Sequence, residues 1–429
     1  MNISIDINND YEIAKHILSK TDLFYYKQTF YIYETNVWKP IDDYKIRKKV
    51  LDILQDKYKQ TRVNNIIDIV KLRTIKDDDE INLTKKINAL NVRNGIYYLD
   101  KKQLKPHDQE TKQLYSTNIF NVEYRPGAKC ERWNQFLNEV FEPDYDKQEK
   151  IALLQEYLGL CLTQDVSFQK ALLLLGTGAN GKSKIIDVME AILGEGNYSN
   201  LELHQLSNPT YRVELQNKIA NFCSEIDYKN KFSSSVFKDI VTGGTLTGDK
   251  KFKDPIKFKP YCKFLFATND LPQTNDTTKG YFRRLLIIKF NRSFEGKEDD
   301  KNLLPKLMAE LDGIFNWMLA GLERLYRNRN FTIPESSEFE VKAYLENSNS
   351  VVSFIHERCE IMQGTYTGYD ELYKQYKIYC SDANLRPFSK QNFKGEIEKQ
   401  FTGKIIFKRR ADRGGNHFEN IRYEYNTYN

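Results

Sequence analysis

The stretch ALLLLGTGANGKSKIIDVMEAIL, residues 171–193, decides the fold of this chain. Five consecutive apolar residues lead into the motif GxxxxGK(S/T) at 176–183, and apolar residues at helical spacing follow it. A buried strand, a glycine-rich loop and a helix in this order form a phosphate-binding loop, because backbone N–H groups at a helix start can converge on phosphate oxygens. The sequence therefore predicts a nucleotide site within an α/β fold.

The loop itself supplies the predicted phosphate ligands. Its glycines allow the backbone to wrap around an anion, Lys182 adds a positive charge at the β and γ phosphates, and the hydroxyl of Ser183 can ligate Mg²⁺. The residues expected to bind the nucleotide are Gly176, Gly178, Asn180, Gly181, Lys182 and Ser183.

Two later apolar segments end in polar side chains that suit phosphate chemistry. KIANFCSEID ends in Glu225 and Asp227, and an acid on a strand beside the loop can hold Mg²⁺ through water and orient the attacking water. CKFLFATN ends in Asn269, whose amide can contact a γ-phosphate. A solubilising role for the acids and a helix-cap or turn role for Asn269 remain open alternatives.

Two adjacent arginines precede the last apolar strand of this region, LLIIKF. Arg283 or Arg284 can act as a finger that reaches a γ-phosphate bound by a neighbouring subunit. A surface salt-bridge pair would have the same sequence, and the sequence does not choose which arginine is the finger.

Positive charge is concentrated in one segment. Between Lys229 and Lys263 there are nine Lys and three Asp, a local excess that equals the formal charge of +6 for the whole chain. A lysine-rich loop of this kind can bind nucleic-acid phosphates. Lys250, Lys251 and Lys253 surround Phe252, which can stack on a base or pack within the loop.

Composition argues against membrane and disulfide-stabilised proteins. Hydrophobic residues make up 40% of the chain, and the apolar runs are far shorter than the roughly 20 residues of a membrane helix. The N-terminus lacks the pattern of a secretory signal. The six cysteines are widely separated and form no CxxC pair, so neither zinc nor disulfides are expected. We expect a cytoplasmic protein.

Breaks in the pattern divide the chain into four predicted parts. They are an α+β region of unknown role at 1–80, a largely helical domain at 81–165, the ATPase domain at 166–335 and a C-terminal domain at 346–429. The Asn94-Gly95 pair predicts a tight turn, and a helical stretch is expected over 302–326 with a linker after it at 332–337.

The C-terminal part has a winged-helix pattern of three helices and a β-hairpin. Its hairpin contains basic residues suited to phosphate contacts, namely Lys408, Arg409 and Arg410. Because this part is nearly balanced in charge, a packing or partner-binding role stays open.

Taken in order, these motifs resemble a superfamily 3 helicase of the AAA+ class, and more closely the phage/plasmid and poxvirus-type primase-helicase branch. The text at 153–163 also resembles the helical domain that precedes the ATPase in that branch. The matching blocks are GTGANGKS at 176–183, SEID at 224–227, TGGTLTGDKKFKDPIKFKP at 242–260, FATNDLP at 266–272 and YFRRLLIIKF at 281–290.

The resemblance implies an AAA+ P-loop ATPase core between the N-terminal region and the winged-helix-like domain, with ATP and Mg²⁺ as cofactors. It implies Ser183 and, through water, Glu225 at the metal, Asn269 as the γ-phosphate sensor, and an arginine that acts in trans. The implied catalytic set is Lys182, Glu225, Asp227, Asn269, Arg283 and Arg284. The implied DNA-binding set is Lys250, Lys251, Phe252 and Lys253 in a hairpin facing the pore of a homohexamer, with Lys408, Arg409 and Arg410 in the tail.

The predicted function is that of a replicative, ATP-dependent DNA helicase with 3′ to 5′ polarity. It would hold a single strand in its pore and unwind duplex at a fork or origin of a mobile genetic element or phage, in a bacterial cytoplasm. About 80 residues precede the helicase-associated region and show no recognisable metal-binding carboxylate pattern, so primase activity is not expected. A primase or an origin-binding protein is a candidate partner. The alternatives are a nucleotide-gated origin-binding initiator and a non-unwinding AAA+ DNA remodeller.

Overall fold

Five parallel strands form the central sheet of the computed structural model, in the order β13-β7-β12-β9-β8. Their bounds are β7 (Ala171–Leu175), β8 (Tyr198–Ser199), β9 (Ala220–Cys223), β12 (Lys263–Thr268) and β13 (Leu285–Lys289). Every residue of β7, β9 and β12 is buried, as expected for parallel strands that are covered on both faces.

The structure describes residues 6–226, 232–251, 254–272, 274, 276, 278–294, 300–383, 385, 387–410 and 415–423.

Two hydrophobic layers cover the sheet, because alternate side chains of a strand point to opposite faces. Leu172 and Leu174 pack with helices on one face, whereas Leu173 and Leu175 pack on the other. The first layer contains α5 (Glu131–Val140), α6 (Lys147–Leu160), α7 (Lys182–Leu193), α11 (Leu303–Met308) and α12 (Leu311–Asn328). The second contains α9 (Ser234–Val241), α10 (Lys279–Phe282) and the hairpin of β10 (Leu246–Gly248) and β11 (Ile256–Phe258). The short α8 (Pro209–Arg212), η2 (Gln205–Ser207) and η3 (Val213–Leu215) precede β9.

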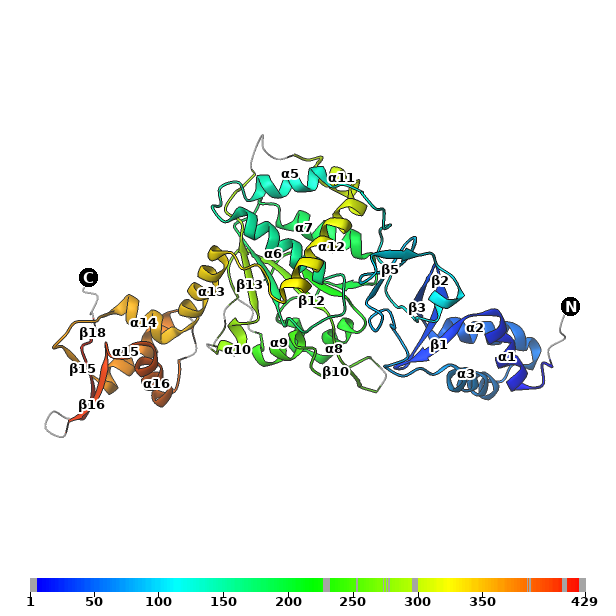
Figure 1. The fold of residues 1–429 in the computed structure, drawn as a ribbon. Coiled ribbons are helices and arrows are strands. Elements are labelled where there is room, and N and C mark those ends of the chain that lie inside the picture. The colour runs from blue at the N-terminus through cyan, green and yellow to red at the C-terminus, as the bar shows by residue number, and fades with distance from the viewer. Residues whose placement is uncertain are drawn as a thin grey trace.

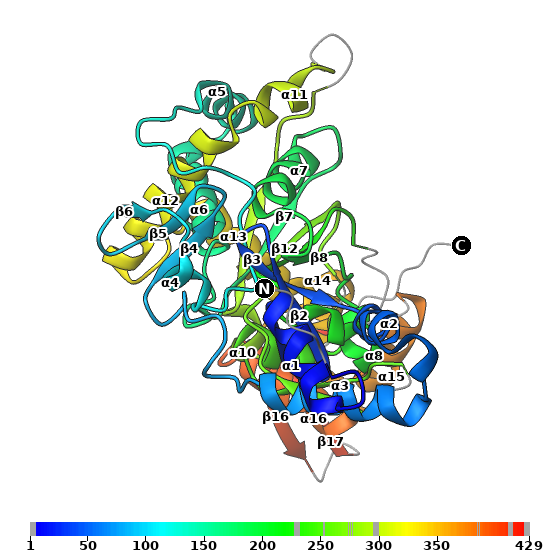
Figure 2. The same cartoon turned by 90° about the vertical axis from the view of Figure 1, so that its right-hand side faces the viewer.

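The N-terminal region lies to one side of this body (Figure 1). Its antiparallel sheet, β1-β2-β3, packs against three helices that bury their own apolar cluster. Figure 2 views the molecule with these helices in front. The bounds are α1 (Asp10–Lys20), β1 (Leu23–Tyr26), β2 (Thr29–Glu34), β3 (Val37–Ile41), α2 (Asp43–Leu54), η1 (Gln55–Lys57) and α3 (Gln60–Thr74).

A second small antiparallel sheet, β4-β5-β6, connects this region to the body. Val92 pairs with Gly95, so the turn is formed by Arg93 and Asn94, one residue earlier than the expected Asn94-Gly95 turn. The bounds are β4 (Ala89–Val92), β5 (Gly95–Tyr98), β6 (Gln103–Lys105) and α4 (Gln109–Lys112).

The C-terminal region lies on the opposite side of the body (Figure 1). Three helices surround a cluster of aromatic side chains and carry a three-stranded antiparallel sheet in the order β15-β17-β16. The bounds are α13 (Glu335–Ser348), α14 (Ser350–Arg358), β14 (Cys359–Glu360), β15 (Tyr366–Gly368), α15 (Tyr369–Asp382), α16 (Lys390–Gln400), β16 (Ile406–Arg410), β17 (Gly415–Glu419) and β18 (Arg422–Tyr423).

The helical stretch expected over 302–326 is confirmed, and it consists of two helices, α11 and α12, with a break between them. The break places Glu310 at the start of α5, where its carboxylate accepts hydrogen bonds from the backbone N–H groups of Arg132 and Trp133, both at 3.0 Å. A carboxylate stabilises unpaired N–H groups at a helix N-terminus. The expected linker at 332–337 is likewise structured in part, because α13 begins at Glu335.

Across the part of the chain that the structure describes, no helix combines the length and the apolar character needed to cross a membrane.

Candidate nucleotide-binding site

The glycine-rich loop joins β7 to α7 in a conformation that only small residues allow. Gly178 and Gly181 have φ angles of +95° and +88°. A Cβ atom at Gly181 would lie 2.9 Å from the ring of Phe136, whereas one at Gly178 would meet no heavy atom within 4 Å. The loop is therefore packed against α5 at one end and open at its centre, which leaves room for a phosphate group.

Lys182 is turned inward onto the loop. Its Nζ donates to the carbonyl oxygen of Gly176 at 2.5 Å and to Oδ1 of Asn180 at 2.9 Å, and the residue is 6% exposed. Burial lowers the pKa of Lys182, and both acceptors are neutral oxygens. The ammonium charge of Lys182 is therefore not neutralised by these acceptors and can attract an anion bound in the loop.

β9, which precedes Glu225, and β12, which precedes Asn269, end at the same edge of the sheet as the loop. Leu175 is paired with Thr268 and Phe266 with Cys223, so Glu225 stands level with Thr268. The Ile226 N–H donates to the carbonyl oxygen of Ala267 at 3.2 Å, which holds the chain on this course after β9 ends.

One cavity of about 550 Å³ is lined by Lys182, Ser183, Glu225 and Asn269. Its volume is in the range of small-molecule and nucleotide sites. These four predicted residues are thus brought together, along with Gly178, Asn180 and Gly181 of the loop. Asp227, which the sequence predicts beside them, lies outside the described residues.

The donor set fits Mg²⁺, which prefers oxygen ligands and is commonly held by one or two protein groups together with phosphate oxygens and water. Ser183 and Glu225 offer a hydroxyl and a carboxylate on the same cavity wall. Among the described residues, no group of three or more His, Cys, Asp or Glu side chains could hold a metal by itself.

The same cavity is also lined by residues that belong to none of the predicted motifs. Phe136, Phe294 and Leu303 are apolar, and Arg132 lies there in an ion pair with Glu139 at 3.2 Å. Their positions depend on α5 and α11 folding over the loop. The sequence signal here is WNQFL at 133–137, which resembles the helical domain that precedes the ATPase in the poxvirus-type branch but contains no chemical motif.

Arg283 and Arg284 lie at the opposite edge of the sheet. Leu285 is paired with Ala171 at the start of β7, whereas the loop follows Leu175 at its end. Four strand steps separate the two edges by about 13 Å. Arg284 donates to the carbonyl oxygen of Gly280, and its Nε is buried without a hydrogen-bond partner. Burial, followed by the charge of Arg283, lowers the pKa of Arg284.

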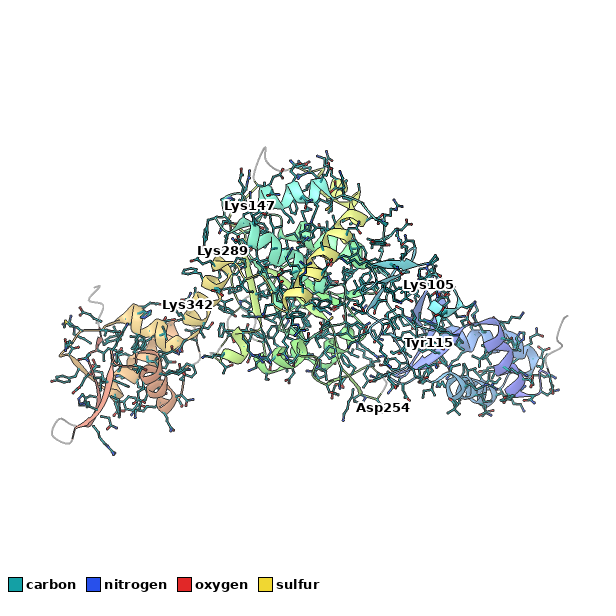
Figure 3. All side chains as sticks on the ribbon, viewed as in Figure 1. Lys105, Tyr115, Lys147, Asp254, Lys289 and Lys342 are labelled. Atoms are coloured by element: carbon teal, nitrogen blue, oxygen red, sulfur yellow. The ribbon has the colours of Figure 1, made fainter. Side chains whose placement is uncertain are left out.

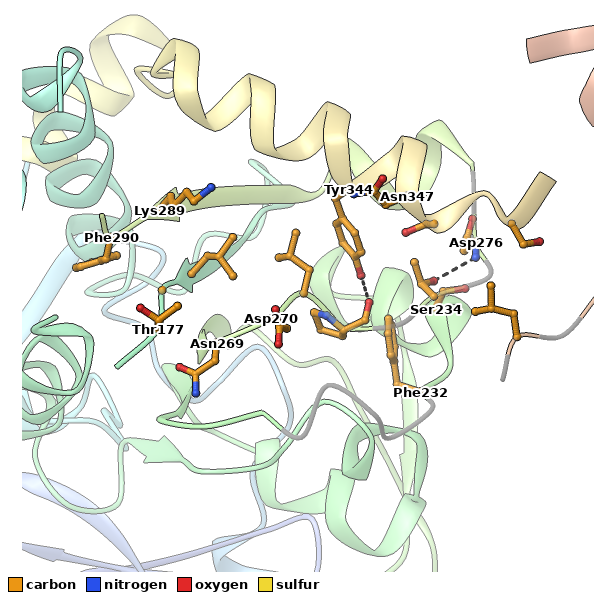
Figure 4. A pocket seen from close by; sticks show the side chains of 18 of the residues that line it. Thr177, Phe232, Ser234, Asn269, Asp270, Asp276, Lys289, Phe290, Tyr344 and Asn347 are labelled. Carbon is orange, nitrogen blue, oxygen red and sulfur yellow. Dashed lines mark hydrogen bonds between the residues drawn. The ribbon is translucent and has the colours of Figure 1, made fainter. Parts of the chain in front are cut away.

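A larger cavity of about 1060 Å³ lies on the other side of the loop (Figure 4). It extends from Thr177 and Asn269 to Tyr344 and Asn347 on α13, and Tyr344 donates a hydrogen bond to the carbonyl oxygen of Pro272. The site therefore borders the helix that leads into the C-terminal region.

The predicted DNA-binding residues fall in two places. Lys250 and Lys251 follow β10 at the end of the β10–β11 hairpin, and Lys250 donates to Oγ1 of Thr29 at 3.2 Å. Phe252 and Lys253 lie outside the described residues. Lys408 and Arg409 are exposed on β16, and of Arg410 only the backbone is described, as part of the same strand.

Three family models match successive parts of the chain. "D5 N terminal like" covers residues 11–142, a family of unknown function, DUF5906, covers 174–284, and "Poxvirus D5 protein-like" covers 346–428. Both ends of the chain match models of D5-type families. The resemblance to the poxvirus-type primase-helicase branch is therefore confirmed.

Curated relatives of this chain carry helicase and primase names. A candidate helicase of Acanthamoeba polyphaga mimivirus is 26% identical over 352 residues, which cover 68% of this chain and 36% of the relative. A candidate primase of African swine fever virus (isolate Warthog/Namibia/Wart80/1980) is 21% identical over 347 residues, covering 75% and 36%. The chain thus spans about a third of the length of these relatives.

Solved structures support the fold of the chain. The apo form of the C-terminal region of NrS-1 matches with a TM-score of 0.54 at 15% identity, over 93% of this chain and 88% of that one. At this identity the likeness shows the fold alone. A mixed α/β chain with a five-stranded parallel sheet, consistent with a P-loop ATPase core and preceded by an α+β region, agrees with the predicted fold class at that level.

Proposed function

We propose that this chain is an ATP-dependent DNA helicase of superfamily 3 with an AAA+ core. The observation that carries the proposal is the division of the site between two edges of one sheet. Lys182, Glu225 and Asn269 line one cavity, and Arg283 and Arg284 stand at the opposite edge. In this proposal, the arginine of a neighbouring copy completes the site.

Bound ATP with Mg²⁺ supplies a γ-phosphoryl group that water can attack in line. Lys182 would leave the carbonyl oxygen of Gly176 and donate to the β and γ phosphates, while Ser183 and Glu225 hold the metal, Glu225 through water. Asn269 would position the attacking water beside the γ-phosphate. Arg284 or Arg283 of the next subunit would balance the charge that develops there. Asp227 is proposed as the second acid of this set.

The working form that fits these roles is a homohexamer around one DNA strand. Each subunit would contribute its β10–β11 hairpin to the pore, with Lys250, Lys251, Phe252 and Lys253 at the tip. Hydrolysis at successive interfaces would move the hairpins along the strand, with 3′ to 5′ polarity expected from the family resemblance. Lysine contacts to phosphates are independent of base sequence, which suits translocation.

The C-terminal region is proposed to be a winged-helix-like domain that contacts duplex. Three helices with the β15-β17-β16 sheet support this interpretation, and the exposed Lys408 and Arg409 lie on one strand of that sheet. The four parts at 1–80, 81–165, 166–335 and 346–429 remain the proposed domains. The proposed setting is replication of a mobile genetic element or phage, with a primase or origin-binding protein as partner.

Strand displacement on a forked duplex tests the proposal. Wild type and Lys182→Ala would be compared with ATP and Mg²⁺, beside ATP hydrolysis with and without single-stranded DNA. Displacement by wild type alone is the expected result. DNA-stimulated hydrolysis without displacement would favour the AAA+ remodeller, and DNA binding without hydrolysis would favour the nucleotide-gated initiator.

A further inference from the structure

The turn between β1 and β2 contacts the β10–β11 hairpin on both sides of the hairpin tip, once after β10 and once before β11. Before the tip, Nζ of Lys250 donates to Oγ1 of Thr29 at 3.2 Å. After the tip, the carbonyl oxygen of Asp254 accepts from Nε2 of Gln28 at 3.4 Å. Figure 3 shows Asp254 where the central body meets the N-terminal region. Two neighbouring residues of the N-terminal region therefore hold the hairpin on both sides of its tip.

The turn that presents these residues is a tight two-residue connection. Tyr26 pairs with Thr29, so Lys27 and Gln28 form a two-residue connection, and their φ angles are +41° and +61°. A turn with both central residues at positive φ matches the twist of the strands that it joins. Thr29 thus contacts the hairpin from the first position of β2, and Gln28 contacts it from the two-residue turn before that strand.

Two further sets of interactions lie near this contact between the N-terminal region and the body. Nδ2 of Asn217 donates to the hydroxyl of Tyr31 at 2.8 Å, which ties the segment before β9 to β2. Asp78 accepts from the Tyr26 hydroxyl and from Lys27, both at 2.7 Å. Burial opposes ionisation of Asp78, but these bonds, with the charges of Lys27 and Lys259, lower its pKa. Lys259 follows β11, so opposite charges also attract across this contact.

We propose that Gln28 and Thr29 form a clasp that competes with DNA for the hairpin. The clasp rests on the proposed function, in which Lys250 binds a DNA phosphate. While its ammonium donates to Thr29 and the other limb is held by Gln28, the hairpin cannot follow a strand through the pore. DNA must therefore displace the clasp, and the N-terminal region restrains the hairpin until DNA is present.

The test removes the hydroxyl acceptor from the clasp in the full chain. Thr29→Val keeps the β-branched side chain on β2 and removes Oγ1, whereas Thr29→Ser keeps the hydroxyl. Thr21→Val is the matched control, since Oγ1 of Thr21 accepts from Nζ of Lys49 at 3.1 Å within the N-terminal region and away from the hairpin. Affinity for labelled oligo(dT) would be measured by fluorescence anisotropy at fixed salt, beside ATP hydrolysis without DNA.

Thr29→Val is expected to bind oligo(dT) about three- to tenfold more tightly than wild type, the range that one hydrogen bond supplies. Thr29→Ser and Thr21→Val should bind as wild type does, and hydrolysis without DNA should be equal in all four proteins. A structural defect alone would not tighten binding.

Unchanged or weaker binding by Thr29→Val would overturn the clasp. The proposed function survives that result if wild type binds oligo(dT) and Lys250→Ala weakens the binding. Tight binding by Thr29→Ser would also overturn the clasp, because the hydroxyl would not be the responsible group. Absence of oligo(dT) binding by wild type would overturn the proposed function and the clasp with it.

Discussion

Glu156 and Arg324 form an ion pair between α6 and α12, with Oε1 and Nε 2.6 Å apart and the glutamate side chain fully buried. The same carboxylate accepts hydrogen bonds from the N–H and the hydroxyl of Thr332, at 2.7 and 2.8 Å. It therefore joins two helices over the sheet to the segment that leads to α13.

Replacing Glu156 by Ala should lower the free energy of unfolding by about 3 kcal/mol, because removal of a buried, multiply bonded carboxylate leaves its partners without acceptors. Urea denaturation followed by circular dichroism measures this. Glu323→Gln is the control, since that glutamate is half exposed, and it should change stability by less than about 0.5 kcal/mol. Equal effects of the two changes would contradict the prediction.

Lys182→Ala should reduce ATP hydrolysis at least about a hundredfold, because the loop loses the cation that faces the β and γ phosphates. Isothermal calorimetry with a non-hydrolysable ATP analogue and a phosphate-release assay would measure binding and turnover. Lys129→Ala, at an exposed position before α5, is the control and should leave both unchanged. ATP hydrolysis by Lys182→Ala at the wild-type rate would contradict the assignment of the loop as the phosphate site.

Arg284→Ala should keep nucleotide binding and lose hydrolysis, since Arg284 lies at the edge of the sheet away from its own loop. Mixing Arg284→Ala with Lys182→Ala should restore part of the hydrolysis, because some interfaces would combine an intact loop with an intact arginine. The same pair of assays on Arg283→Ala decides which arginine is the finger. If neither arginine variant regains ATP hydrolysis when it is mixed with Lys182→Ala, the result would argue against an arginine that acts in trans.

The double change Lys250→Ala with Lys251→Ala should weaken binding to single-stranded DNA and abolish its stimulation of hydrolysis. The slope of log affinity against log salt concentration should also become shallower, by about one for each phosphate that the protein no longer binds. Anisotropy titrations at several salt concentrations measure both effects. An unaltered salt dependence would place the DNA-binding residues elsewhere in the chain.

The lowered pKa of Asp276 predicts that the free energy of unfolding decreases at acid pH. Burial opposes its ionisation, but hydrogen bonds from Lys238, Thr278 and Ser234 lower its pKa to about 2, below the unfolded value of 3.8. The ionised form therefore stabilises the fold above pH 4, and this contribution is lost as the pH falls from 4 to 2. Asp276→Asn should cost about 2 kcal/mol at pH 7 and well under about 1 kcal/mol at pH 2, where the carboxyl is half protonated in the folded state.

Urea denaturation at several pH values measures the Asp276 effect, with Asp270→Asn as the control at an exposed position. A penalty for Asp276→Asn that does not change between pH 7 and pH 3 would contradict the assigned pKa.

Local pattern predicted the long elements and missed the short one. The apolar runs that became β7, β9, β12 and β13 were identified because buried parallel strands are continuously apolar. β8 has two residues, too few for any period, and exists because β9 lies beside it. The buried Asn221 accepts from Leu201 N–H at 2.9 Å and donates to the Leu201 carbonyl oxygen at 2.8 Å, which fixes that edge.

The sequence by itself determined the phosphate loop, the strands around it and the kind of side chain at each strand end, because these depend on residues that are neighbours in the chain. Only the tertiary structure decided at which edge of the sheet the polar residues that flank each strand lie. Strand pairing brought Glu225 and Asn269 beside Lys182 and placed Arg284 at the far edge. The contact of Thr29 with Lys250 joins residues 221 positions apart, and a contact of that separation follows from packing between regions, which no local pattern encodes.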